Sequence, residues 1–432
     1  MSFRKLIYQS VIWRGLYFTS VLLLNVLVAR HFEASYSGTI YFITNSYALV
    51  LLLLSLSLES GTGYYAATAK VAPEKLGNFA IAWSLLSSGL ILTFALSSLG
   101  YFNQKEQELH TGLAALYYVG GCMLTNFFLS LFYAKQEFLL PNLILALINF
   151  GLIFLLGFSG KYGLSLKSFI TIYFLTFLLQ GVCMAILYLA RNSTRWTASI
   201  PAPAELKGIF RFSLLALLAN FIFFLVYRID YWFVNAFCSP SDLGNYIQVS
   251  KLVQIFLILP TIIASVVFPQ IAGGNKLESI RGLKLLCTSL LLLYGIACIL
   301  LAISGQWVFP LVFGHSFENM YYPFLLIIPG IISLAILTPL SAYFAGENRV
   351  RVNIISSSLG LVVIVIGDLT LVPRFGIKAA ALVSSLGYFV CLVFSLVAFT
   401  LSEKISITDV MSFGRKDLQR IISYLNEKNK IT

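Results

Sequence analysis

Long apolar runs, one after another, constrain this chain more than any motif in it. A helix that crosses the hydrocarbon core of a bilayer needs about 20 mostly apolar residues. Hydrophobic residues make up 59% of the 432 residues and charged residues only 11%, against about 25% charged residues in a typical soluble domain. The sequence therefore predicts an all-α integral membrane protein. Twelve transmembrane helices are expected, near residues 8–29, 38–58, 79–101, 110–133, 139–159, 168–190, 208–237, 244–271, 282–304, 321–345, 351–372 and 376–400.

The positions of lysine and arginine give the expected orientation, because cytoplasmic segments carry the excess of these residues. With the N-terminus placed in the cytoplasm, twenty of the 29 basic residues fall on the inner side and six on the outer side. Arg14, Arg228 and Lys251 remain within spans. Both termini are thus expected in the cytoplasm. The net charge of +12 then reflects topology and attraction to anionic lipids, so nucleic acid is not an expected partner.

Three short stretches recur in the same order in the two halves of the chain. The paired positions are Gly38 with Gly244, Asn142 with Asn353, and Gly163 with Gly376. The matches indicate six spans duplicated as six more, and because six is even, both copies enter the membrane from the same side. We expect a six-helix bundle at 1–190, a cytoplasmic linker at 191–207, a second bundle at 208–400 and a basic cytoplasmic tail at 401–432. Two bundles related by an axis along the membrane normal are the architecture of an alternating-access carrier.

Charged residues within the spans are the candidate functional residues, because each costs roughly 2.5–3.5 kcal/mol on insertion scales. In FLVYRIDYWFVN, Arg228 and Asp230 are two residues apart and point about 200° apart on a helix, so they cannot pair with each other. Lys251 is expected at a similar depth in the next span, where an ion pair with Asp230 is geometrically reasonable. The alternative to a functional role is a buried ion pair that only fixes helix packing.

A cationic cavity is the functional interpretation of these residues. Arg228, Lys251 and Arg14 would attract an anionic head group, since arginine binds phosphate in a bidentate fork and lysine acts as a point charge. Arg14 lies close enough to the inner surface to snorkel instead. Asp230 or Asp368 would couple transport to an ion gradient by protonation. Asp368 lies five residues before Pro373, and a solvated helix end or a helix partner is the first expectation for it.

Several stretches resemble the polysaccharide flippases of the multidrug/oligosaccharidyl-lipid/polysaccharide exporter superfamily. The stretches are DYWFVNAFCSPSDLGNYIQVSKLVQIFLILPTIIASVVFPQIA at 230–272, LTLVPRFGIKAAALVSSLGY at 369–388 and ARHFEASYSGTIYF at 29–42. The similarity covers roughly residues 5–400. The acid at Asp368 and the acid at Glu59 depart from the pattern of that family.

The resemblance implies two six-helix bundles in a V around a central cavity. It also implies a flippase that moves an undecaprenyl-diphosphate-linked oligosaccharide, a repeat unit of O-antigen, capsule or another surface polysaccharide, across the inner membrane of a bacterium. Membrane lipids surround such a protein, and a polysaccharide polymerase and a chain-length regulator are partners that the resemblance allows. It gives no identity for the glycan, because this family diverges with its cargo.

Two rival functions compete with the flippase. A cation-coupled multidrug antiporter of the same superfamily would want acids in its cavity without matching cations, whereas three of the charges within spans are basic. An enzyme would need catalytic groups, yet His31, His110 and His315 stand singly in outer turns, and the sequence has no Walker A motif. The six cysteines have no CxxC spacing. We therefore expect no catalytic residues, no cofactor and no metal centre of the zinc type.

Overall fold

The computed structural model describes residues 3–98, 105–162, 166–192, 199–262, 264 and 276–404. Helices account for nearly all of them, and these ranges contain no strand. The helices are α1 (Phe3–Ser55), α2 (Leu58–Ala67), α3 (Pro73–Ser98), α4 (Lys105–Ala134), α5 (Leu139–Tyr162), α6 (Leu166–Asn192), α7 (Pro203–Arg228), α8 (Asp230–Phe237), α9 (Pro240–Phe256), α11 (Lys276–Phe313), the short 3₁₀ helix η2 (His315–Met320), α12 (Tyr321–Gly346) and α13 (Val350–Glu403). The cytoplasmic tail expected at 401–432 lies almost wholly outside the described residues.

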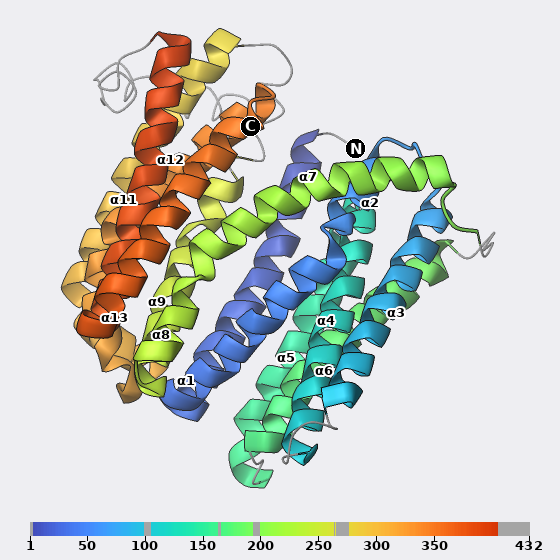
Figure 1. The fold of residues 1–432 in the computed structure, drawn as a ribbon, viewed down its shortest axis with the longest axis horizontal. Coiled ribbons are helices and arrows are strands. Elements are labelled where there is room, and N and C mark those ends of the chain that lie inside the picture. The colour runs from blue at the N-terminus through green and yellow to red at the C-terminus, as the bar shows by residue number, and fades with distance from the viewer. Residues whose placement is uncertain are drawn as a thin grey trace. The chain divides into compact units, whose positions relative to one another are not determined.

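Ten helical segments of the described chain are long and apolar enough to cross a membrane. Two of them, α1 and α13, are each long enough for two spans. The 53 residues of α1 and the 54 residues of α13 would each extend about 80 Å as one straight helix, far beyond a hydrocarbon core of about 30 Å. Each reverses direction at a single residue, Glu33 (φ 59°) in α1 and Gly376 (φ 60°) in α13, as Figure 1 shows. Because α1 and α13 each consist of two arms joined at the reversal, the ten segments correspond to the twelve spans expected from the sequence.

The chain divides into two compact units. Unit 1 comprises residues 1–33 and 39–221, and unit 2 comprises residues 34–38 and 222–432. The division falls inside α7, and the turn at 34–38 in α1 belongs to unit 2. The sequence-based boundaries, with a linker at 191–207, stay a prediction, because residues 193–198 of that linker lie outside the described chain.

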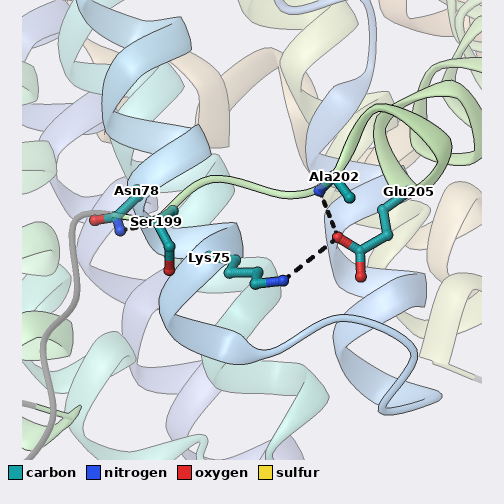
Figure 2. Close-up of polar contacts among 5 residues, drawn as sticks. All are labelled: Lys75, Asn78, Ser199, Ala202 and Glu205. Carbon is teal, nitrogen blue, oxygen red and sulfur yellow. Dashed lines mark hydrogen bonds and ion pairs between the residues drawn. The ribbon is translucent and has the colours of Figure 1, made fainter.

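Polar contacts fasten the start of α7 to the start of α3 within unit 1 (Figure 2). The Asn78 side-chain amide donates to the Ser199 carbonyl at 2.8 Å. Glu205 caps its own helix by accepting from the Ala202 N–H at 2.6 Å, and the Lys75 ammonium lies 3.8 Å from the same carboxylate. A carboxylate in the first turn of a helix also meets the positive end of the helix dipole. The chain before α7 is therefore anchored on unit 1.

The second span ends in a strained turn. Leu56 and Ser57 both adopt left-handed backbone conformations, with φ of 50° and 53°, which cost about 1 kcal/mol or more in residues other than glycine. The surrounding side chains hold the turn in place: the Trp83 indole N–H donates to the Leu54 carbonyl at 3.0 Å, and the Asn220 amide donates to the Ser57 hydroxyl at 3.1 Å. The turn divides α1 from α2, and Glu59 lies in the first turn of α2.

Glycine allows the closest backbone contact in unit 2. The sequence repeat pairs Gly38 with Gly244, and the structure puts their backbones in contact: a methyl group on Gly38 would lie 2.6 Å from the Gly244 Cα. A methyl group on Gly244 would overlap the Ala34 carbonyl oxygen. The Ala34 N–H also donates to the Ser316 hydroxyl at 3.0 Å. The turn at 34–38 is thus docked on the start of α9 and on η2.

Replacing Gly244 by alanine tests this docking. The added methyl group has no room beside the Ala34 carbonyl, so we expect Gly244→Ala to lower the free energy of unfolding by about 1–3 kcal/mol, the usual cost of overpacking. Gly295→Ala is the matched control, since Gly295 in α11 has open space around its Cα and alanine favours a helix. Thermal unfolding in detergent micelles measures both. Equal unfolding midpoints in the two variants would contradict the close contact.

Candidate functional site

Asp230 begins α8, directly after a tightened turn that ends α7. The Trp232 N–H donates to the Ile229 carbonyl three residues earlier, at 3.1 Å, so the helix narrows at this point. The Asp230 side chain is buried, with 1% of its surface exposed. One of its carboxylate oxygens, Oδ2, accepts hydrogen bonds from the Tyr246 hydroxyl and, at 3.0 Å, from the Ser384 hydroxyl. Helices α8, α9 and α13, which are packed against one another, therefore meet at this carboxylate.

A second carboxyl group shares this buried site. Asp368, in the first arm of α13, is fully buried and lies within the electrostatic reach of Asp230 and of Tyr246. Neither Asp368 oxygen has a hydrogen-bond partner among the described residues, and the second oxygen of Asp230, Oδ1, has none either. The expectation that Asp368 is a solvated helix end is wrong, because the second arm of α13 folds back over it after the reversal at Gly376.

The ion pair between Asp230 and Lys251 that the sequence allows is absent from the described structure. The recorded side-chain hydrogen bonds of Asp230 go to Tyr246 and Ser384. Tyr246 and Lys251 are five residues apart on α9, which turns them about 140° away from each other. Since Tyr246 faces Asp230, Lys251 faces elsewhere. The roles predicted for both charged residues remain predictions.

Two of the basic residues predicted to line a cavity, Arg228 and Lys251, are near each other instead. Lys251 lies within the electrostatic reach of Arg228, and the Arg228 guanidinium lies 5.2 Å from the centre of the Phe224 ring, a cation–π contact. Unit 2 thus holds an acidic pair, Asp230 and Asp368, where α8, α9 and α13 meet, and a basic pair, Arg228 at the end of α7 and Lys251 on α9. A pair of like charges held together attracts an ion of the opposite sign.

Two tyrosines lie between the acidic pair and the basic pair. The Tyr231 and Tyr246 rings meet edge to face, with centroids 6.1 Å apart and an interplanar angle of 87°. The Tyr231 hydroxyl donates to the Ser250 hydroxyl at 2.8 Å, and Ser250 precedes Lys251. Sequence reasoning did not identify Tyr246 or Ser384 as site residues. The one available signal was their position in the two stretches, 230–272 and 369–388, that carry the family resemblance.

Arg14 belongs to unit 1. Its side chain is exposed, and its guanidinium lies 4.9 Å from the centre of the Tyr133 ring. The Tyr133 hydroxyl donates to the Asn142 side-chain oxygen at 3.0 Å. Arg14 is therefore held on an aromatic ring with its charge accessible, and its predicted role in a cavity stays a prediction.

The oxygen atoms around Asp230 and Asp368 suit a small hard cation or a proton. Carboxylates and hydroxyls are the ligands that such cations prefer. Two buried carboxylates within each other's electrostatic reach repel each other unless a cation or a proton compensates. No group of three or more His, Cys, Asp or Glu side chains that could hold a metal ion occurs within the described residues. Asp230 and Asp368, with the Ser384 hydroxyl, would hold the ion.

Replacing Asp368 by asparagine tests whether its carboxyl is an unsatisfied buried charge. We expect Asp368→Asn to raise the free energy of unfolding by about 1–3 kcal/mol in a sodium-free choline buffer at pH 8, because the carboxyl must either carry a buried charge or hold a proton there, whereas an amide needs neither. Glu318→Gln, at a side chain that is 66% exposed, is the control and should change little. Thermal unfolding measures both. A lower unfolding midpoint for Asp368→Asn would show that its charge is already satisfied.

No protein-family model matches the sequence, and no curated protein matches it either. Solved structures do match. The chain is similar to the lipid II flippase MurJ in an inward closed conformation, with a TM-score of 0.71 and 15% identity over 96% of this chain and 93% of that one. It is similar to a multidrug resistance MATE family transporter of the MOP superfamily in an inward-facing conformation, with a TM-score of 0.69 and 12% identity over 91% and 95%.

The chain is also similar to the Vibrio cholerae MATE transporter VcmN in the bent form, with a TM-score of 0.62 and 14% identity over 95% of this chain and 99% of that one. At these identities the similarity shows the fold alone. It agrees with the fold class expected from the sequence. The chain has the fold of the transporters of the MOP superfamily, which include both flippases and multidrug exporters, and it is a multi-pass membrane protein.

Proposed function

We propose that this protein is a flippase for an undecaprenyl-diphosphate-linked oligosaccharide in the inner membrane of a bacterium, coupled to a gradient of protons or sodium ions. The observation that carries the proposal is the separation of charge inside unit 2. A buried acidic pair, Asp230 and Asp368, suits a coupling cation, and a basic pair, Arg228 and Lys251, suits an anionic head group.

The basic pair supports an anionic cargo. A lipid-linked diphosphate concentrates negative charge at the head group, and a guanidinium beside an ammonium offers it both bidentate and point-charge contacts. Placing such cations within a membrane costs free energy unless they face water or a ligand. One of the matched structures is a lipid II flippase, which supports a lipid as the cargo.

The acidic pair supports coupling to an ion. Binding of a proton or sodium ion between Asp230 and Asp368 relieves the repulsion of two buried carboxylates, so the site with and without the cation differs in stability. A transporter that moves cargo against a gradient needs a site of this kind, whose occupancy biases one conformation over another. Both termini would lie in the cytoplasm, and a polysaccharide polymerase and a chain-length regulator would be the protein partners.

The alternative is a cation-coupled multidrug antiporter, supported by the matched MATE transporters. Such an antiporter also needs buried acids, but its cationic substrates would be repelled by Arg228 and Lys251. The lipid fraction of cells that lack this protein distinguishes the two functions. The flippase predicts accumulation of one defined undecaprenyl-linked oligosaccharide and loss of the matching surface polymer. Normal lipids together with new sensitivity to cationic dyes would support the antiporter.

The same cells, complemented with variants, test the basic pair. We expect Arg228→Ala and Lys251→Ala each to lower the export of the surface polymer more than tenfold, because the anionic head group loses a cation that it needs for binding. Lys378→Ala is the matched control: Lys378 is an exposed lysine of unit 2 that lies 4.7 Å from the centre of the Tyr322 ring. Immunoblots of membranes check that all variants are present. Normal export by both variants would refute the role of the basic pair.

A further inference from the structure

The acidic pair and the basic pair of unit 2 use the same helices. Asp230 follows Arg228 by two residues, across the tightened turn between α7 and α8. Tyr246 and Lys251 are five residues apart on α9, which separates their Cα atoms by about 7.5 Å along the helix axis. One helix therefore carries both a hydrogen-bond partner of the acidic pair and one of the two cations. Because the two pairs share helices, a change at the acidic pair can alter the geometry of the basic pair.

A chain of buried contacts runs from one site to the other. It begins at Asp230, which accepts from the Tyr246 hydroxyl. The Tyr246 ring packs edge to face on Tyr231, and the Tyr231 hydroxyl donates to Ser250, the residue before Lys251. Tyr231, Tyr246 and Ser250 are all buried, so every contact of the chain lies in a packed interior with little free space.

We propose that Tyr246 is the positioning residue that couples ion binding at Asp230 and Asp368 to anion binding at Arg228 and Lys251. The inference rests on the proposed function and deepens it, because it assigns the coupling to one hydroxyl group. Tyr246 acts through its neighbours, because its side-chain contacts among the described residues are with Asp230, Ser384 and Tyr231.

The chemistry of the hydroxyl explains the coupling. Tyr246 donates its proton to the same oxygen, Oδ2, that accepts from Ser384. A cation or a proton that binds at the open oxygens of Asp230 and Asp368 withdraws negative charge from Oδ2, so the hydrogen bond from Tyr246 weakens and its hydroxyl can turn away. The Ser384 hydroxyl is 3.3 Å away and offers it another partner. Since the Tyr246 ring is close-packed against Tyr231, a change at its hydroxyl end is transmitted to Tyr231 and, through Ser250, to the turn of α9 that carries Lys251.

Thermodynamic linkage gives the measurable consequence. If the ion changes the affinity for the anion by some factor, the anion changes the affinity for the ion by the same factor. Couplings of this kind are typically about 5- to 150-fold. Loss of the Tyr246 hydroxyl should remove the effect of the ion on the affinity for the anion, while the ion and the anion each still bind. Loss of a residue that contacts the ion or the anion should instead abolish the binding of that ligand.

The experiment measures the affinity of the purified full-length protein for farnesyl diphosphate, a short lipid diphosphate, by calorimetry in detergent. Three buffers of equal ionic strength are compared: sodium chloride at pH 8, choline chloride at pH 8 and choline chloride at pH 6. We expect the wild-type affinity to differ at least fivefold between two of them. In Tyr246→Phe the same comparison should differ less than twofold, with binding of the probe retained.

Tyr343→Phe is the matched control. Tyr343 is a buried tyrosine of α12 whose hydroxyl donates to Glu403 at 2.6 Å, outside the contact chain, so its variant should keep the wild-type factor. The control also corrects for the change in ionisation of farnesyl diphosphate between pH 8 and pH 6. Should Tyr246→Phe fail to fold, as judged by size-exclusion chromatography, Ser250→Ala removes the last contact of the chain and should lower the factor in the same way.

The outcomes separate the inference from the proposed function. A wild type whose affinity for the probe is the same in all three buffers, or that does not bind it, contradicts the proposed function and the inference with it. A wild type that shows the ion dependence, together with a Tyr246→Phe variant that shows it equally, contradicts the inference alone. If the affinity for the probe depends on the ion in the wild type and in Tyr343→Phe, but not in Tyr246→Phe, the proposed function and the inference are both supported.

Discussion

The cost of placing charge inside a membrane governs the arrangement of unit 2. Asp230 is buried and is held by two hydroxyl groups, from Tyr246 on α9 and Ser384 on α13. Asp368 is buried beside it and its oxygens have no partner in the described residues. An isolated charge in such surroundings is unfavourable by several kcal/mol. The site can persist only if a proton or a cation compensates, and a requirement of this kind makes the conformation of three helices depend on an ion.

Backbone geometry brings these groups together. The reversal of α13 at Gly376 folds its second arm, with Ser384, back along the arm that carries Asp368. At Ile229 the helix tightens by one three-residue hydrogen bond between Arg228, which ends α7, and Asp230, which contacts α9 and α13. Glycine permits the close approach at the turn 34–38, where the backbones of Gly38 and Gly244 touch. Breaks and small residues are thus placed where spans reverse or cross, as membrane helices require.

The sequence predicted the spans well, because hydropathy is a local property that about 20 consecutive residues determine. The reversal at Glu33 falls in the turn expected between the first two spans, and the reversal at Gly376 falls on the first residue expected of the last span. The sequence could not predict the partners of the charged residues. Asp230 pairs with hydroxyls on α9 and α13 rather than with Lys251, and Asp368 is buried rather than solvated, because both outcomes depend on how three distant helices pack. Periodicity along one helix contains no information about that packing.

Infrared difference spectroscopy of the purified protein tests the central claim, a cation or proton shared by Asp230 and Asp368, most directly. A protonated buried carboxyl has a C=O stretching band that an ionised one lacks. We predict such a band in choline buffer at low pH, its loss when the pH is raised or sodium is added, and the absence of this change from a variant that carries both Asp230→Asn and Asp368→Asn. A wild type without a band that responds to pH and sodium, or a double variant whose band responds as in the wild type, would contradict a shared cation or proton.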